Sequence, residues 1–321
     1  MHRRSLLGLA AAMPLASRAL PALAQEARPV RLVLPFPAGG ATDAVARVLA
    51  PGMAERLGQP VVIDNRPGAG GVPAAENVVR AAPDGLTLFF TTSSTHSAGP
   101  AVTPNLPYDV EADFTPVALL ATQPYLLVIS STVPARTVEE FITWAKARPG
   151  QVNYGSSGVG TAPHLTGALF AALAKLQMVH VPYRGTGQVY AELRRGDVHA
   201  LFDTPSTAAP HLASGTVRAL GVGGRETPLV PGLPSLSRAV PGFESEVWFG
   251  LFGPARLPAE QVARLREAAI GAARDPALRE KLAGLGAEPK GEDGEALRRV
   301  AAAERARWTA LVRDPGIRAS D

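Results

Sequence analysis

Residues 30–43 read VRLVLPFPAGGATD and decide how the chain begins to fold. The first five residues are apolar enough for a buried strand, and the helix expected to follow ends at Gly58. Between them lies a loop, residues 35–40, with two adjacent glycines. Because glycine carries no Cβ, such a loop lets a ligand approach the backbone closely. A strand, a glycine-rich loop and a helix in this order predict an α/β fold.

The same order recurs in the second half of the chain. A short strand at 152–154 is followed by the glycine-rich loop 155–161 and by a helix that Pro163 opens. Strands and helices alternate around both loops, and helices are expected after Pro254 to about Val312. The segments predicted to be strands are 30–34, 61–64, 86–90, 116–120, 125–129, 152–154, 178–181, 198–202, 217–222 and 248–252.

Two architectures fit this order. In the first, two α/β lobes are joined by two crossing strands, 125–129 and 248–252, which hold equivalent places in the two halves. This architecture gives a discontinuous lobe of residues 25–126 plus 249–321 and a second lobe of residues 127–248. In the second, all strands join one larger doubly wound sheet. We prefer the first, because each half has its own glycine-rich loop after its first strand.

The composition excludes several classes of protein. The chain has 321 residues, of which 46% are hydrophobic and 19% are charged. This length allows two domains of ordinary size, and the low charged fraction argues against a disordered acidic or basic chain. The chain has no cysteine. A disulfide framework, a thiolate zinc site, an iron–sulfur cluster and a cysteine nucleophile are therefore excluded.

The first 24 residues resemble an export signal. Arg3 and Arg4 precede an apolar segment, residues 6–16, and residues 22–24 form the Ala-Leu-Ala pattern read by signal peptidase. The paired arginines fit a twin-arginine signal, with a Sec signal as the alternative. Because the apolar segment is too short to span a bilayer, we expect cleavage after about Ala24 and a periplasmic mature protein.

Signal cleavage changes how the charge is interpreted. The formal net charge of the full chain is +4, from 32 basic and 28 acidic residues. Cleavage removes three arginines and no acid, so the mature charge is about +1. A nearly neutral chain lacks the basic surface that nucleic-acid binding needs. No other stretch has the ~18 apolar residues of a membrane helix, so the mature chain is not expected to insert into a membrane.

Several catalytic signatures are absent from the sequence. There is no P-loop, and the segment around Ser157 has Val159 where a nucleophile elbow needs its second glycine. Residues 158–160 begin like a dinucleotide-binding fingerprint, but Pro163 stands in the place of the third glycine. The histidines beyond the signal show no zinc-binding spacing. We therefore expect no cofactor, no metal and no catalytic residue.

The two glycine-rich loops form the strongest candidate binding site. Each leads into a helix N-terminus, which offers free N–H groups and the positive end of the helix dipole. Both loops are expected at the carboxyl ends of strands, where open α/β sheets bind ligands. Two such helix ends facing one crevice suit an anion, and a carboxylate is the simplest candidate. The alternative is that both loops are ordinary turns that bind nothing.

Further polar residues are expected at strand ends, each with a simpler structural role as the alternative. Asp43 and Asp203 suit a ligand's amine or hydroxyl group, or else they cap the helices beside them. Arg184 suits a bidentate clamp on a carboxylate, or else it lies free on the surface. Ser93 and Ser94 offer hydroxyl groups at the end of the third strand. All of these residues are candidate ligand contacts.

Four linked motifs resemble those of one family. Residues 35–43 (PFPAGGATD) and 65–71 (NRPGAGG) are similar to its first two loops. Residues 154–161 (YGSSGVGT) and 180–185 (HVPYRG) are similar to its second-lobe loops. The family is that of the substrate-binding proteins of tripartite tricarboxylate transporters, the Bug-type periplasmic receptors. The resemblance covers essentially all of the mature chain, and it extends to Asp203, residues 248–251 and residues 285–289.

The resemblance implies a type II periplasmic binding protein with two lobes, two crossing hinge strands and a small carboxylate closed between the lobes. It also implies membrane permease subunits as partners. One departure is Ala168, where the family commonly has glutamate, so the support of the helix or its loop is expected to differ here. By position, the resemblance assigns ligand contacts to Phe36, Ala38, Gly39, Thr42, Asp43, Ser156, Ser157, Gly158, Thr161, Tyr183 and Asp203. Gly40, Ser93, Ser94, His164 and Arg184 complete the expected ligand-binding residues.

Functions from three classes follow from these observations. The preferred function is an exported receptor that captures a small carboxylate for a tripartite tricarboxylate-type transporter or a sensor. Its ligand would be a dicarboxylate or tricarboxylate, an acidic amino acid or an aromatic acid. The alternative is an exported α/β enzyme in which Asp43, His164 or Asp203 acts as acid or base. A purely structural partner-binding protein would instead have a filled crevice between the lobes.

Overall fold

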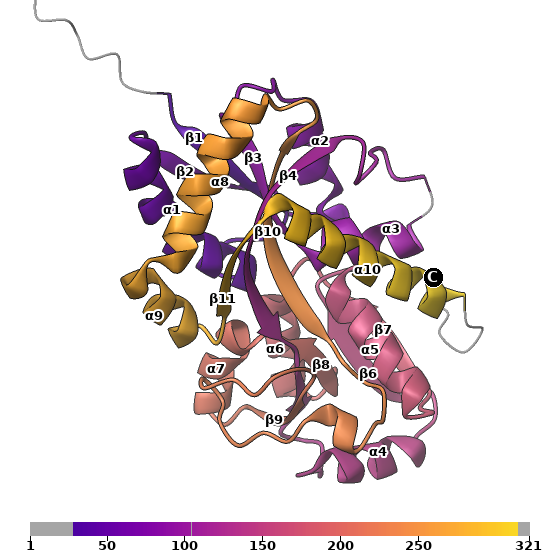
Figure 1. Ribbon diagram of the computed structural model, residues 1–321. Coiled ribbons are helices and arrows are strands. Elements are labelled where there is room, and N and C mark those ends of the chain that lie inside the picture. The colour runs from indigo at the N-terminus through magenta and orange to yellow at the C-terminus, as the bar shows by residue number, and fades with distance from the viewer. Residues whose placement is uncertain (1–27, 104, 314–321) are drawn as a thin grey trace, which may run out of the picture.

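The computed structural model describes residues 28–103 and 105–313, and the predicted signal segment, residues 1–24, lies outside them. The strands form a six-stranded and a five-stranded mixed sheet, which lie at the top and the bottom of Figure 1. We call each sheet with its helices the first lobe and the second lobe, respectively. This two-sheet architecture confirms the predicted fold class, and a single doubly wound sheet is excluded. No helix in the described ranges is long and apolar enough to cross a membrane.

The first sheet has the strand order β11-β4-β10-β3-β1-β2. β1 (Val30–Leu34) pairs in parallel with β2 (Val61–Asn65) and β3 (Thr87–Thr92). β1 is buried on both faces, because Leu32 packs in the cluster that contains α1 and α8 while Val33 packs in the cluster that contains α2 and α10. The helices of this lobe are α1 (Ala41–Leu57), α2 (Val72–Val79), α3 (Gly99–Val102), α8 (Ala259–Arg274), α9 (Pro276–Gly284) and α10 (Gly294–Val312).

One strand of the first sheet differs from the sequence prediction. Only helices were expected beyond Pro254, but residues Glu288–Asp293 form β11, which pairs antiparallel with β4 (Phe114–Pro124). The segment reads EPKGED and has no alternation of apolar residues. It is nevertheless a strand because it lies at the sheet edge, where only one side needs hydrogen bonds and both faces need not be apolar.

The second sheet has the order β7-β6-β8-β5-β9 and repeats the parallel arrangement of the first. Within it, β6 (Val152–Ser156) pairs in parallel with β7 (Met178–Pro182) and β8 (Ala200–Asp203). β5 (Leu126–Ser130) lies antiparallel between β8 and β9 (Val217–Val222). The helices of this lobe are α4 (Val138–Lys146), α5 (Ala162–Leu173), α6 (Thr186–Arg195) and α7 (Pro205–Ala213).

The chain crosses between the sheets at two adjacent points. Tyr125 alone separates β4 from β5, and Ser245 leads directly into β10 (Glu246–Pro254), which lies between β3 and β4 in the first sheet. The N–H of Tyr125 donates to the carbonyl of Ser245 at 3.1 Å, and the N–H of Gly223 donates to the carbonyl of Tyr125 at 2.7 Å. The two crossing segments are therefore bonded to each other and to the end of β9.

Candidate functional site

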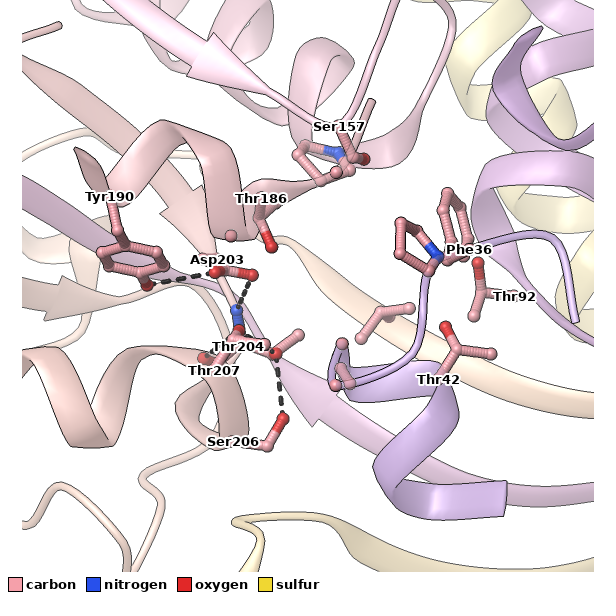
Figure 2. Close-up of a pocket in the computed structure, with 18 of the residues that line it drawn as sticks. Phe36, Thr42, Thr92, Ser157, Thr186, Tyr190, Asp203, Thr204, Ser206 and Thr207 are labelled. Atoms are coloured by element: carbon pink, nitrogen blue, oxygen red, sulfur yellow. Dashed lines mark hydrogen bonds between the residues drawn. The ribbon is translucent and has the colours of Figure 1, made fainter. Parts of the chain in front are cut away.

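A cavity of about 460 Å³ lies between the two lobes. Its walls are the loops at the carboxyl ends of β1, β3, β6, β7 and β8, which is where α/β sheets bind ligands. Tyr125, Val247 and Phe249 of the crossing segments also line it. Figure 2 shows the second-lobe wall, with Thr186, Asp203, Thr204, Ser206 and Thr207, opposite the first-lobe wall, with Phe36, Thr42 and Thr92.

The first-lobe wall contains an open helix N-terminus. α1 begins after Gly40, and the residues Gly40, Ala41 and Thr42 all line the cavity. Their backbone N–H groups have no acceptor among the residues that the structure describes. A helix of 17 residues also places the positive end of its dipole here. This wall therefore offers several N–H donors and a favourable potential to an anion.

Asp43 supports this wall and does not line the cavity. Its carboxylate accepts hydrogen bonds from the Gly39 N–H at 3.0 Å, from Arg47 Nε at 2.8 Å and from Asn65 Nδ2 at 3.2 Å. Burial alone would raise the pKa of Asp43, but these hydrogen bonds outweigh burial and hold the pKa below its ordinary value. Asn65 also donates to the carbonyl of Phe36 at 3.0 Å. Asp43 and Asn65 therefore fix the shape of the loop.

The second-lobe wall is built mainly from two helix N-termini that were not predicted to contribute. α6 begins after Gly185, and its residues 186–188 line the cavity. α7 begins after Thr204, and Thr204, Ser206 and Thr207 line the cavity. Both helices follow a parallel strand, so the strand-end argument used for the two glycine-rich loops would have found them. Their four hydroxyl side chains, on Thr186, Thr204, Ser206 and Thr207, make this wall polar.

Asp203 ends β8 between these two helices. It is 3% exposed and lines the cavity. Its Oδ2 accepts a hydrogen bond from the Tyr190 hydroxyl at 3.0 Å, and its Oδ1 accepts one from the Thr204 N–H at 2.8 Å. Burial raises the pKa of Asp203 to about 6, although the hydrogen bonds that it accepts favour the ionised form. The wall opposite α1 thus contains a buried acid.

The N-terminus of α5 is closed, contrary to the expectation for the second glycine-rich loop. The N–H of Ala162 donates to Ser94 Oγ of the first lobe at 3.0 Å, and Pro163 has no N–H. The N–H of Thr161 donates to the carbonyl of Gly158 at 3.3 Å. Residues 155–164 therefore contribute only Ser157 and Pro163 to the lining. The second helix end that faces the crevice is not that of α5 but those of α6 and α7.

Polar groups of this loop are satisfied within the loop. Ser156 Oγ accepts from the Gly158 N–H at 3.0 Å and bonds to His180 Nε2 at 2.7 Å. Thr161 Oγ1 donates to the Gly158 carbonyl at 2.7 Å. Gly158 itself has φ 131°, a value that L side chains rarely adopt. These contacts give Ser156, Gly158 and Thr161 a structural role in shaping the loop.

Two histidines, His164 and His180, bond to the loop 155–161. His164 is fully buried, its Nδ1 accepts from the Gly160 N–H at 3.2 Å, and its ring stacks on that of His180 with 3.8 Å between centroids. Burial lowers the pKa of His164 to about 4. Burial and the neighbouring His164 lower the pKa of His180 to about 3. Both rings are therefore neutral at ordinary pH, and neither lines the cavity.

The expected ligand-binding residues divide into two groups. Those that line the cavity are Phe36, Ala38, Gly39, Gly40, Thr42, Ser94, Ser157, Arg184 and Asp203. Those that do not line it are Asp43, Ser93, Ser156, Gly158, Thr161, His164 and Tyr183. Lining residues that the sequence analysis did not name include Thr92, Tyr125, Thr186, Gln188, Tyr190, Thr204, Ser206, Thr207, His211 and Phe249.

The cavity does not assemble the acid–base set of the enzyme alternative. Asp203 lines the cavity, whereas His164 does not and Asp43 is bonded to its own loop. Within the described part of the chain, no group of three or more histidine, aspartate or glutamate side chains is placed to hold a metal ion. The cavity lining therefore offers backbone N–H groups, hydroxyls, the exposed guanidinium of Arg184, the ring of His211 and the buried carboxylate of Asp203.

Comparison with known proteins identifies the family. A profile of the tripartite tricarboxylate transporter family receptor matches residues 45–317. Protein BugT of Bordetella pertussis is 34% identical over 90% of each chain. The solved structure of MatC from Rhodopseudomonas palustris with bound malate is 37% identical, with a TM-score of 0.83 over 89% of this chain and 99% of that one.

A second solved structure, R. palustris Rpa4515 with adipate, is 35% identical, with a TM-score of 0.86 over 90% of this chain and 98% of that one. These similarities extend across both lobes and the crossing segments between them. They confirm the resemblance seen in the glycine-rich loops. The chain belongs to the tripartite tricarboxylate transporter receptor family, the Bug-type periplasmic solute-binding proteins.

Proposed function

We propose that this chain is a periplasmic receptor that binds a small carboxylate between its lobes and delivers it to the permease subunits of a tripartite tricarboxylate-type transporter. The observation that carries the proposal is the open N-terminus of α1, where Gly40, Ala41 and Thr42 line the cavity and their N–H groups have no acceptor among the described residues. Such a helix end favours an anionic group. The malate and adipate bound in two related structures support the same ligand class.

The shape of the cavity suggests how the ligand lies. One carboxylate would accept hydrogen bonds from the α1 N–H groups, and the rest of the molecule would extend towards α6 and α7. Phe36 and Phe249 supply apolar surface for the carbon chain, while Thr186 and Thr204 supply hydroxyl groups. A volume of about 460 Å³ is in the range of small-molecule sites.

Ligand capture would proceed by closure of the lobes. We assign residues 25–126 plus 249–321 to the first lobe and residues 127–248 to the second, so the chain crosses between them only twice. Rotation about Tyr125 and Ser245 would then open and close the cavity without unfolding either sheet. A ligand that contacts both walls stabilises the closed arrangement. The closed receptor would be the form that a permease, or a sensor protein, recognises.

We also propose that the N-terminal segment exports the receptor. Residues 1–24 would direct the chain to the periplasm, by the twin-arginine or the Sec route, and cleavage after about Ala24 would release the mature receptor. The receptor would act without a catalytic step, because ligand release to the permease needs only reopening of the lobes. The departure at Ala168 would affect α5, in which this residue lies, and not the cavity wall.

A thermal-shift screen of the mature chain, which begins at residue 25, tests this function. The panel holds dicarboxylates, tricarboxylates, acidic amino acids and aromatic acids, each paired with its neutral amide. We expect at least one carboxylate to raise the melting temperature, since a ligand at 100 times its Kd adds about 2.7 kcal/mol to the free energy of unfolding. Its amide should raise it less. The proposal is wrong if no carboxylate stabilises a chain that circular dichroism shows to be folded, or if the amides stabilise it equally.

A further inference from the structure

We infer that Asp203 makes the receptor selective for carboxylates that carry a hydroxyl or amino group, by accepting a hydrogen bond from that group across the cavity. This inference rests on the proposed function and specifies its ligand class. A hydroxy acid and an amino acid share the required chemistry, which is a donor a few atoms from the carboxylate that α1 holds. The experiment below separates the two.

Asp203 is the one buried charged side chain in the described lining of the cavity. The other charged lining residue, Arg184, is exposed. Asp203 is 3% exposed, and it lies on the wall opposite the α1 N-terminus. One wall therefore presents hydrogen-bond donors, and the other presents an acceptor that lacks a cationic partner in contact with it. A ligand that matches both walls must accept at one end and donate at the other.

The carboxylate of Asp203 can exchange one of its present hydroxyl donors for a ligand donor. Its two oxygens offer about four acceptor positions, and the geometry assigns one to the Tyr190 hydroxyl and one to the Thr204 N–H. Figure 2 shows Oδ2 turned to Tyr190 and the rest of the carboxylate beside Thr186 at the cavity. The hydroxyls of Thr186 and Thr207 are also within reach, but a hydroxyl can rotate to another acceptor. A ligand donor can take the place of either one.

The charge of Asp203 also disfavours a competing ligand. A carboxylate placed against Asp203 would bring two anions together in a buried site, where their repulsion is poorly screened. A second carboxylate of a diacid must therefore lie against the hydroxyls of α6 and α7, away from Asp203. A diacid with a hydroxyl or ammonium group can satisfy both requirements at once. An unsubstituted diacid leaves Asp203 without the additional donor.

The burial of Asp203 supports a role beyond stability. Burial raises its pKa to about 6, so the folded chain is more stable with this group protonated. At neutral pH the group is nevertheless ionised, and an ionised carboxylate accepts hydrogen bonds without donating any. Tyr190 and the Thr204 N–H hold it in one orientation, so that its remaining acceptor positions are shared only with hydroxyls of cavity-lining residues, Thr186 and Thr207. These features suit a recognition element.

Titration calorimetry at neutral pH with matched ligands tests the inference. Succinate, malate and aspartate form one set, in which the substituent is hydrogen, hydroxyl or ammonium. Glutarate and adipate, each with its 2-hydroxy and 2-amino forms, make two more sets. In the set that binds best, we expect a donor-bearing acid to bind about 10- to 100-fold more tightly than the unsubstituted acid, the range for one hydrogen bond to a charged group. The preferred substituent separates a hydroxy acid from an amino acid.

The variant Asp203→Asn should remove this preference without a loss of folding. It should weaken the binding of the donor-bearing acid. The unsubstituted acid should bind as before or more tightly, because the repulsion between Asp203 and the ligand's carboxylates is removed. Asp197→Asn, which changes an exposed carboxylate outside the cavity, should leave the preference intact. The inference is wrong if the unsubstituted acid binds as tightly as its donor-bearing partners, or if Asp203→Asn keeps the wild-type ratio. If no acid of the panel binds the folded wild type, the proposed function fails as well.

Discussion

Ser94 and Ala162 lie in different lobes, yet the N–H of Ala162 donates a hydrogen bond to Ser94 Oγ at 3.0 Å. Ser94 follows β3 of the first sheet, and Ala162 is the first residue of α5 in the second lobe. Both residues are buried, and Ser94 also lines the cavity. A hydroxyl accepts with its lone pairs while its hydrogen stays free to donate. Ser94 can therefore bond the second lobe and a ligand at the same time.

Replacing Ser94 should loosen the closed arrangement. Ser94→Ala removes the acceptor of the Ala162 N–H and leaves that buried donor unpaired when the lobes close. We expect ligand dissociation, followed by stopped-flow fluorescence, to be about 3- to 10-fold faster, as for the loss of one neutral hydrogen bond. Ser97→Ala is the control, because Ser97 Oγ donates at 3.0 Å to Ala301 within the first lobe. Equal dissociation rates in the two variants would contradict the role assigned to Ser94.

Gly39 should be sensitive to a side chain because it borders the cavity. Gly39 has φ 82°, and a Cβ added to it would meet no atom within 4 Å. Gly39→Val should weaken ligand binding about 10-fold or more, because its methyl groups fill space that the ligand approaches. Gly58→Val is a matched control, since Gly58 has φ 66°, equally open surroundings and no place in the cavity wall.

Both glycine variants should lose about 1–2 kcal/mol of stability from the same backbone strain. Calorimetry on the two folded proteins then isolates the effect on the cavity. Unchanged affinity in Gly39→Val, or an equal loss in Gly58→Val, would show that the loop does not approach the ligand.

Asp203 should give the stability a specific pH dependence. Its pKa is about 6 in the folded chain and near the ordinary value of 3.8 in the unfolded chain. Between these values the folded state retains a proton that the unfolded state has lost, so the free energy of unfolding falls as the pH rises. Urea unfolding of wild type and Asp203→Asn measures the difference in stability. The free energy of unfolding of the wild type, relative to that of Asp203→Asn, should fall as the pH rises from about 4 to about 6. A relative stability that does not change with pH would contradict the effect of burial on Asp203.

The stacked histidines should act in the opposite direction. Burial holds the folded-state pKa values of His164 and His180 at about 4 and about 3, below the ordinary value of 6.5. The unfolded chain therefore binds protons first, and stability is lost as the pH falls below about 6.5. In the double variant His164→Asn and His180→Gln, side-chain amides can keep the bonds to Gly160 and Ser156. The free energy of unfolding of this variant should fall less steeply below about pH 6.5 than that of the wild type. If both fall with the same slope, the two histidines do not cause the loss of stability in acid.

The sequence predicted the first-lobe part of the cavity lining better than the second-lobe part. The loop 35–40 and the helix after it could be located because their residues are contiguous and the glycines stand beside a helix start. The α5 N-terminus has the same local pattern, but it is closed by Ser94, which lies 68 residues earlier in the chain. Local pattern cannot report such a long-range contact. The α6 and α7 ends were missed, although Thr186 lies between Gly185 and Gly187, because the strand-end argument was applied only to the two longer glycine-rich loops.

The fold, too, could be predicted where it depends on local pattern and not where it depends on long-range contacts. Buried parallel strands such as β1 (VRLVL) are mostly apolar, so they could be predicted from sequence. β11 could not, because its polar residues become a strand only through pairing with β4 at the sheet edge. The two crossing segments were predicted as strands. Their bonding to each other through Tyr125, Ser245 and Gly223 depends on residues about 100 positions apart and appears only in the folded chain.

In the proposed receptor the N-terminus of α1 holds the ligand's carboxylate, and the variant Ala41→Pro removes one of the N–H groups that would bind it. Ala41 is the first residue of α1, a position where proline is well tolerated, and the extended Gly40 before it (ψ 172°) suits a following proline. The variant removes one backbone N–H and keeps the helix. Ala259→Pro makes the same change at the first residue of α8, away from the cavity.

The measurement is calorimetric titration of the best-binding carboxylate into the wild type and both proline variants. We predict one site per chain in the wild type, an affinity about 10-fold weaker or more in Ala41→Pro, and no change in Ala259→Pro. Wild-type affinity in Ala41→Pro, or the absence of carboxylate binding by the folded wild type, would show that the α1 N-terminus does not hold a carboxylate.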